Sequence, residues 1–145
     1  MLFRSIAPLT YAERTALAAG VSLMLAVFFE FYLKYLAGRY WPETWTHGNP
    51  SLIGTGDYGF HPFHFGEAYG SFPSGHTART VAVLSVVGLA YPKLRLPCAG
   101  FCVLVAVSLV AMNYHFVGDT IGGVLLGLGT GVYTTAFFAS PPGKR

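Results

Sequence analysis

The stretch Ser71-Phe72-Pro73-Ser74-Gly75-His76-Thr77-Ala78-Arg79 is a polar and basic insert that stands directly before a long apolar run. Pro73 and Ser74 are typical of a helix start, since proline suits the first turn and serine caps it. The amides of a helix's first turn attract anions, and His76 would lie beside an oxyanion bound there. Most helix starts of this kind only cap a helix, so the remainder of the chain decides between these interpretations.

The composition is that of a membrane protein. Of the 145 residues, 53% are hydrophobic and only 10% are charged, and the mean hydropathy is +0.51. This is too apolar for an ordinary soluble domain. We therefore expect one domain, residues 1–145, with the lipid bilayer as its surroundings and no nucleic-acid partner. Cys98 and Cys102 lie in an apolar run and are interpreted as small buried residues.

Apolar segments separated by polar inserts predict an all-α integral membrane bundle of about four helices. The first begins at a capping box, Thr10-Tyr11-Ala12-Glu13, and lacks the small residues of a signal-peptide cleavage site. Near its end, Glu30 and Lys34 are four residues apart and are expected to pair. The second segment is rather short for a span. The expected spans are about residues 12–37, 75–91, 96–113 and 119–139.

A long loop, residues 38–71, lies between the first two spans. It is rich in glycine, proline and aromatic residues, which suit the boundary between water and lipid. We expect it to form an ordered interfacial cover over the site, because long loops in compact domains are often functional. His61 and His64 have a proline between them and no carboxylate cluster nearby, so they are interpreted as loop-lining residues rather than metal ligands.

The basic residues predict the orientation. With four spans, Arg4, Arg14, Lys93, Arg95, Lys144 and Arg145 fall on one side, and the positive-inside rule makes that side cytoplasmic. We expect a bacterial inner-membrane protein with both termini in the cytoplasm. The polar inserts then converge on the periplasmic face, which carries Lys34, Arg39, His76, Arg79, His115 and Asp119.

Glycines repeat at four-residue spacing in the last predicted span. Gly123, Gly127 and Gly131 would form one face of that helix, and small residues at this spacing let helices pack closely in lipid. We expect this face to pack against other helices, including those of a second copy or of a partner chain.

His115 and Asp119 are four residues apart at the start of that span. The carboxylate would accept a hydrogen bond from one ring nitrogen and leave the other free as a nucleophile or base. An isolated pair of this kind also fits a structural role. With His76, a helix N-terminus and Lys34 on the same face, the set has what phosphoryl transfer through a phosphohistidine needs.

At this point the sequence resembles the type 2 phosphatidic-acid phosphatase superfamily, which shares its site with vanadium-dependent haloperoxidases. The family's central motif, Pro-Ser-Gly-His, stands intact at residues 73–76. Its third motif is matched at Ser108, His115 and Asp119, with Leu109 in place of the motif arginine.

The first motif of the family is matched at Lys34 and Pro42, with Trp41 in place of its arginine. The resemblance covers about residues 33–131. Family members usually have six spans, whereas four are predicted here. This fits either a four-helix version or a bundle that partner helices complete.

The resemblance implies a role for each matched residue. His115 would attack phosphorus, Asp119 would orient it, and His76 would protonate the leaving alcohol. Lys34, Ser74 and the amide of Gly75 would hold the phosphate oxygens, so that no metal or other cofactor is needed.

Three further residues are candidates to replace the missing arginines as phosphate ligands: Arg39, Arg79 and Asn113. The alternatives are ordinary ones, since Arg39 also fits an interfacial anchor and Arg79 an ion pair with Glu67 or Asp57. Loss of one oxyanion donor typically costs about 3–4 kcal/mol, so these replacements bear directly on activity.

The function expected from these features is that of an integral-membrane lipid phosphatase acting on a phosphate monoester or pyrophosphate. Two alternatives stay open. The protein would transfer the phosphate to a lipid or sugar hydroxyl, or it would be a catalytically weakened member that binds lipid or assists assembly. A haloperoxidase is disfavoured because those enzymes are soluble.

Overall fold

The computed structural model describes residues 8–44 and 48–138, which form four α-helices and two short 3-10 helices. Predictions that concern Arg4, Lys144 and Arg145 lie outside these residues. The all-α prediction is confirmed for the described part of the chain, where the extended segments pair only through isolated bridges. In order, the elements are α1 (Tyr11–Ala37), η1 (Glu67–Tyr69), α2 (Gly75–Ala90), η2 (Pro92–Leu94), α3 (Arg95–Ala111) and α4 (Val117–Phe138).

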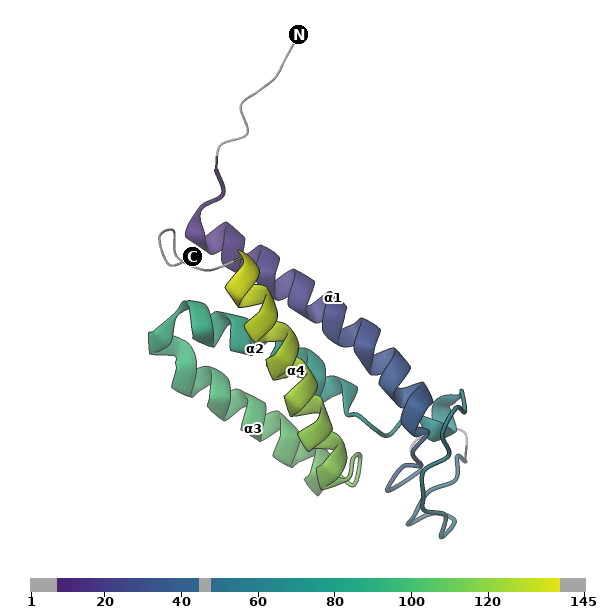
Figure 1. Ribbon diagram of the computed structural model, residues 1–145. Coiled ribbons are helices and arrows are strands. Elements are labelled where there is room, and N and C mark those ends of the chain that lie inside the picture. Colours follow the sequence, from purple (N-terminus) through teal and green to yellow (C-terminus); the bar gives the residue numbers. More distant parts are fainter. Residues whose placement is uncertain (1–7, 45–47, 139–145) are drawn as a thin grey trace.

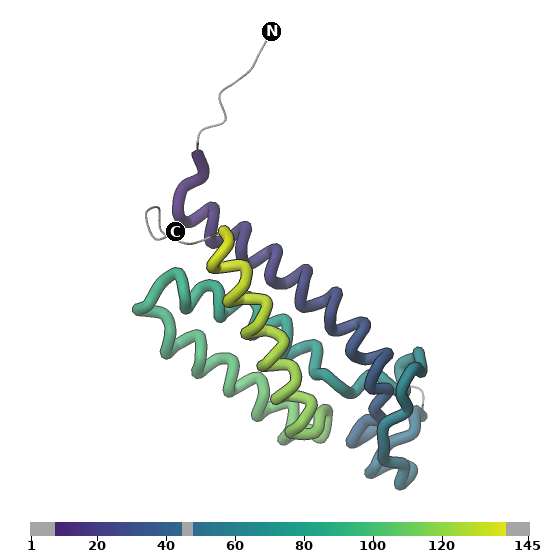
Figure 2. Tube along the Cα trace, viewed as in Figure 1, coloured from purple at the N-terminus to yellow at the C-terminus, as the bar shows by residue number. Residues whose placement is uncertain are grey.

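The second helix is the centre of the bundle. It contacts α1, α3 and α4, while α3 packs mainly on α2. Figures 1 and 2 show the long loop between α1 and α2 at the same end of the bundle as the α3–α4 turn. The α2–α3 turn lies at the opposite end. The predicted polar inserts are therefore gathered at one end.

Local capping explains where the first two long helices begin. The Thr10 amide donates to the Glu13 carboxylate at 2.7 Å, and the Thr10 hydroxyl accepts from the Glu13 amide at 3.3 Å. This confirms the capping box. Helix α1 ends at Gly38, whose left-handed φ of 55° suits glycine. Helix α2 is capped by Ser74, which accepts from the Thr77 amide.

Three helical segments are long and apolar enough to cross a membrane, judged by length and composition. They are Tyr11–Ala37, Pro92–Ala111 and Val117–Phe138. Helix α2 has 16 residues and is shorter, as its sequence suggested. Large apolar side chains such as Met24, Leu96 and Leu125 point outward, which is the arrangement expected of a bundle surrounded by lipid.

The glycine face of α4 packs against α2 of the same chain. A Cβ atom on Gly123 would lie 2.6 Å from the carbonyl oxygen of Ser74, and one on Gly127 would lie 2.6 Å from that of Ala78. Gly131 lies against the side chain of Ser85. The glycine spacing predicted a packing face, and the helix packed on it is α2. Within the chain, α2 covers these glycines; assembly with a second copy or a partner chain stays a prediction.

Candidate active site

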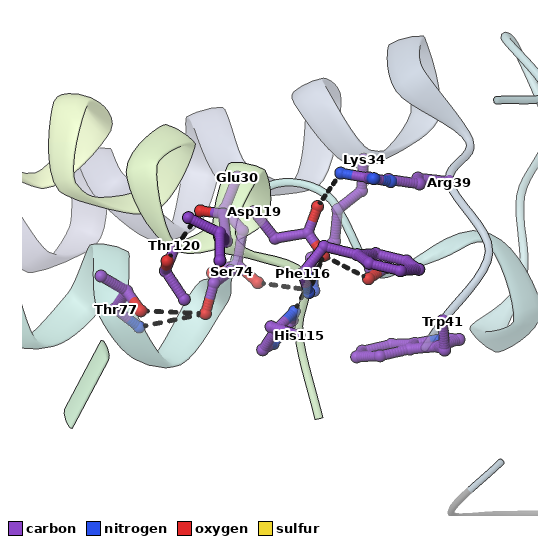
Figure 3. Close-up of polar contacts among 12 residues, drawn as sticks. Glu30, Lys34, Arg39, Trp41, Ser74, Thr77, His115, Phe116, Asp119 and Thr120 are labelled. Atoms are coloured by element: carbon purple, nitrogen blue, oxygen red, sulfur yellow. Dashed lines mark hydrogen bonds and ion pairs between the residues drawn. The ribbon is translucent and has the colours of Figure 1, made fainter. Parts of the chain in front are cut away.

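The candidate site lies where the end of α1, the start of α2 and the start of α4 meet (Figure 3). A hydrogen bond from the Ser74 amide to the Asp119 carbonyl, 2.9 Å long, joins the starts of α2 and α4. The chain from Gly38 onward adds Arg39, whose carbonyl accepts from the Ser71 amide at 3.1 Å. Residues from three separate parts of the sequence are thus held at one end of the bundle.

His115 and Asp119 are neighbours, as their spacing predicted. The His115 ring is buried, and its Nδ1 lies 3.5 Å from the Asp119 Oδ2. This is longer than a good hydrogen bond, and among the described residues Nδ1 has no other hydrogen-bond partner. Catalytic hydrogen bonds are often long before substrate binds. Because Asp119 faces Nδ1, the other ring nitrogen, Nε2, is the one left for chemistry.

Asp119 is itself held from several directions. Arg39 Nη1 lies 2.7 Å from its Oδ1, while the Ser71 hydroxyl and the Phe116 amide donate to Oδ2 at 2.6 and 3.0 Å. The carboxylate is fully buried. An arginine and two further donors fix the orientation of this buried carboxylate.

Arg39 is directed toward Asp119. Its second Nη donates to the Tyr58 hydroxyl at 3.0 Å, and its guanidinium lies 4.1 Å from the ring centre of Phe116. Arg39 is only 7% exposed. It was predicted as a substitute phosphate ligand or an interfacial anchor. Its burial and its ion pair instead favour a positioning role behind Asp119.

Glu30 joins the two remaining cations. Lys34 Nζ lies 2.9 Å from its carboxylate, which confirms the predicted pair. Arg79 donates to the same carboxylate through Nε and Nη2 at 3.1 and 3.2 Å. The partner of Arg79 is therefore Glu30 and not Glu67 or Asp57. Glu30 is 3% exposed, whereas the Lys34 and Arg79 side chains are 28% and 48% exposed, so the cations remain accessible.

The start of α2 leaves backbone donors for a ligand. The Ser74 hydroxyl caps Thr77 and the Ser74 amide is used by Asp119. Gly75 and His76 follow in the first turn, where helix geometry supplies no carbonyl acceptor for their amides. A side chain at Gly75 would collide with the Glu30 carboxylate, so glycine lets that carboxylate approach the helix start.

His76 is exposed and faces the other charged groups of the site. It lies close enough to interact electrostatically with His115, Arg79, Lys34 and Glu30. Tyr114 contacts both histidine rings, with ring centres 5.8 Å from His76 and 5.3 Å from His115. The predicted acid and the predicted nucleophile thus both contact Tyr114, and His76 also lies near two cations.

The family model described as the PAP2 superfamily matches residues 15–140. The chain belongs to the PAP2 superfamily. This confirms the resemblance carried by Pro73–His76 and His115–Asp119.

Two curated relatives of this PAP2 chain are described as lipid A 1-phosphatases. That of Rhizobium johnstonii is 30% identical over 86 residues, which cover 57% of this chain and 35% of the relative. That of Rhizobium etli is 31% identical over 74 residues, covering 49% and 32%. The chain spans about a third of the length of these relatives. No solved structure matches it. The apolar helices and these relatives together identify an integral membrane protein.

Aromatic and apolar groups stand where the family resemblance expected two arginines. Trp41 donates from Nε1 to the Glu67 carbonyl at 2.6 Å, and its ring centre lies 5.1 Å from that of His115. The carbonyl of Leu109 accepts from the amides of Tyr114 and His115 at 2.9 and 3.1 Å. In this PAP2 member, Trp41 therefore packs against the His115 ring, and Leu109 anchors the turn that carries His115.

Asn113 has a clear structural role in the same turn. Its φ of 55° places it in the left-handed region that asparagine tolerates, and its side chain is exposed. Contact with an oxyanion stays a prediction for this residue. No group of three metal-ligating side chains occurs within residues 8–44 and 48–138.

Sequence reasoning missed several residues of this PAP2 site. Ser71 and Tyr58 support Asp119 and Arg39, and Glu30 holds two cations. Of these contacts, only the pair of Glu30 with Lys34 was indicated by the sequence, through their four-residue spacing. The contacts of Ser71 to Asp119 and of Arg79 to Glu30 join residues 48 and 49 apart in sequence, which no local pattern indicates.

Proposed function

We propose that this PAP2 superfamily member hydrolyses a lipid phosphate monoester or pyrophosphate through a phosphohistidine on His115. The observation that carries the proposal is the buried His115, whose Nδ1 faces a carboxylate fixed by Arg39. A histidine held in this way presents Nε2 as a nucleophile and is stabilised by Asp119 when it becomes positively charged.

The first step forms a bond between His115 Nε2 and phosphorus and breaks the bond between phosphorus and the leaving oxygen. His76 gives its proton to that oxygen. Lys34, Arg79 and the free amides at the start of α2 would stabilise the charge on the transferred group.

In the second step, water attacks phosphorus and breaks the bond to His115 Nε2. His76, now neutral, takes a proton from this water. Inorganic phosphate leaves, and both histidines return to their starting states. The same intermediate would pass its phosphoryl group to a lipid or sugar hydroxyl if such an acceptor displaced water.

The relatives support a lipid substrate without identifying it. Candidate substrates are phosphatidate, phosphatidylglycerophosphate, a polyprenyl pyrophosphate and lipid A 1-phosphate. We further propose that the site faces the periplasm. Arg14, Lys93 and Arg95 lie at the far end of the bundle from His115, which favours a cytoplasmic location for that end.

Purified protein in detergent, supplied with each lipid carrying labelled phosphate, tests the proposal. Free labelled phosphate that depends on His115 supports hydrolysis, whereas a labelled acceptor supports transfer. The replaced motif arginines favour one competing function, that of a non-enzymatic lipid-binding or assembly subunit. Absence of both products with every lipid would favour this alternative.

A further inference from the structure

A cavity of about 500 Å³ opens beside the candidate site. The end of α1 and the loop that follows it form its walls. Three of its lining residues belong to the site or contact it: Lys34, Trp41 and Tyr114. Trp41 and Tyr114 both contact the His115 ring. A group bound in the cavity would therefore lie next to a phosphate held at His115, so both groups can belong to one ligand.

The lining combines flat aromatic surfaces with hydrogen-bonding groups. Six of the lining side chains are aromatic: Phe31, Tyr35, Trp41, Phe65, Tyr69 and Tyr114. The polar side chains of the lining are Lys34, Glu43, Asn49, His64 and Glu67. Neither carboxylate forms an ion pair with another residue of the described chain. Glu43 Oε1 accepts from the Thr44 amide at 2.9 Å, but a carboxylate has several acceptor sites, so both side chains can still accept hydrogen bonds from a ligand.

This chemistry selects among the groups that a lipid phosphate carries. An acyl chain would strip water from Glu43 and Glu67 without replacing its hydrogen bonds. A second phosphate would be repelled by the same two carboxylates. A sugar ring suits both features, because its C–H faces stack on aromatic rings and its hydroxyls donate to carboxylate and amide oxygens.

We propose that this cavity binds the sugar of a glycosyl phosphate headgroup whose phosphate lies at Lys34 and His115. The proposal rests on the phosphatase function above and narrows its substrate class. This explains tryptophan at position 41, where the family motif has arginine. The Trp41 ring would stack on the sugar, whereas an arginine would pair with the phosphate.

The test compares two lipid phosphates in the same detergent, lipid A 1-phosphate with a glycosyl headgroup and phosphatidate without one. Glu67→Ala removes a cavity carboxylate and leaves the backbone carbonyl that Trp41 uses. We expect kcat/KM to fall about tenfold for lipid A 1-phosphate, because the sugar loses one hydrogen bond to a charged group. For phosphatidate, which has no sugar, we expect a fall of less than twofold. Asp57→Ala is the matched control, because Asp57 is an acidic residue of the same loop outside the cavity.

Equal losses on both lipids, or an equal loss in Asp57→Ala, would overturn the proposal. A second measurement does not need turnover: direct binding of glucose 1-phosphate and glycerol 3-phosphate to the purified protein, followed by NMR. We expect glucose 1-phosphate to bind at least tenfold more tightly and to lose that advantage in Glu67→Ala. Equal binding of the two contradicts the sugar site. Selective binding without turnover of any lipid would leave the sugar site standing and reject the phosphatase function.

Discussion

Arg39 and Asp119 form a buried ion pair behind the proposed nucleophile, and this pair assigns Arg39 its role. A guanidinium that is 7% exposed and already paired is poorly placed to receive a substrate phosphate. It is well placed to hold the Asp119 carboxylate in its orientation toward His115. We therefore expect Arg39 to act through Asp119 and not by contact with substrate.

Arg39→Ala should lower kcat by roughly 100-fold with little change in KM, because a loosened Asp119 misplaces the His115 ring. It should also lower the melting temperature, since breaking a buried ion pair costs about 3–5 kcal/mol. Arg39→Lys should restore part of kcat. Steady-state kinetics and thermal unfolding in detergent measure both effects. A raised KM with unchanged kcat would show instead that Arg39 contacts substrate.

Glu30→Gln should lower kcat/KM by about tenfold on the preferred lipid phosphate, because the two cations lose the charged hydrogen bonds that place them. Glu13→Gln is the matched control, an acidic residue of the same helix that caps its distant end. If both variants leave kcat/KM unchanged, Glu30 has no positioning role for Lys34 and Arg79.

At the scale of elements, α2 and α4 pack with almost no space between their backbones. Gly123, Gly127 and Gly131 allow this approach, and the approach brings the starts of both helices together at Ser74 and Asp119. The distance between these two helix starts, which carry the candidate site, therefore depends in part on glycines several turns further along α4.

Gly127→Ala should destabilise the protein by about 1–3 kcal/mol, because the added Cβ meets the Ala78 carbonyl and backbone cannot move aside cheaply. Gly129→Ala is the control in the same helix, since nothing lies within 4 Å of a Cβ there. It should be neutral or slightly stabilising, as alanine favours helix over glycine. Thermal unfolding in detergent compares the two, and equal destabilisation would contradict the observed packing.

Local features of this fold were predictable from sequence, and distant contacts were not. Thr10 and Ser74 indicate helix starts, because each side chain accepts a hydrogen bond from the amide three positions later. The glycine spacing predicted a packing face, but nothing in it names α2 as the partner. Arg39 and Asp119 are 80 residues apart, so their ion pair depends on how the whole loop folds back. The histidines and Asp119 were predictable because family motifs preserve their spacing.

At the scale of the whole molecule, the candidate site lies at one end of the bundle and basic residues lie at the other. The loop, the α2 start and the α3–α4 turn share one end, while Arg14, Lys93 and Arg95 share the other. In a bilayer, the charges of the basic end favour the cytoplasm, and we propose that the end with the candidate site therefore faces the outer leaflet and its lipid phosphates.

A membrane-impermeant thiol reagent tests this orientation in intact cells. Cys98 and Cys102 are first replaced by alanine. Asp57→Cys in the loop should then be labelled from outside, and Lys93→Cys should be labelled only after the membrane is opened. The reverse pattern would place the site in the cytoplasm.

Trapping the phosphoenzyme tests the central proposal most directly. Protein quenched during turnover of a labelled lipid phosphate should carry an alkali-stable, acid-labile phosphate on His115, and His115→Ala should carry none and release no phosphate. Steady hydrolysis with no phosphate on His115, or unchanged release by His115→Ala, would contradict the assignment of His115 as the nucleophile.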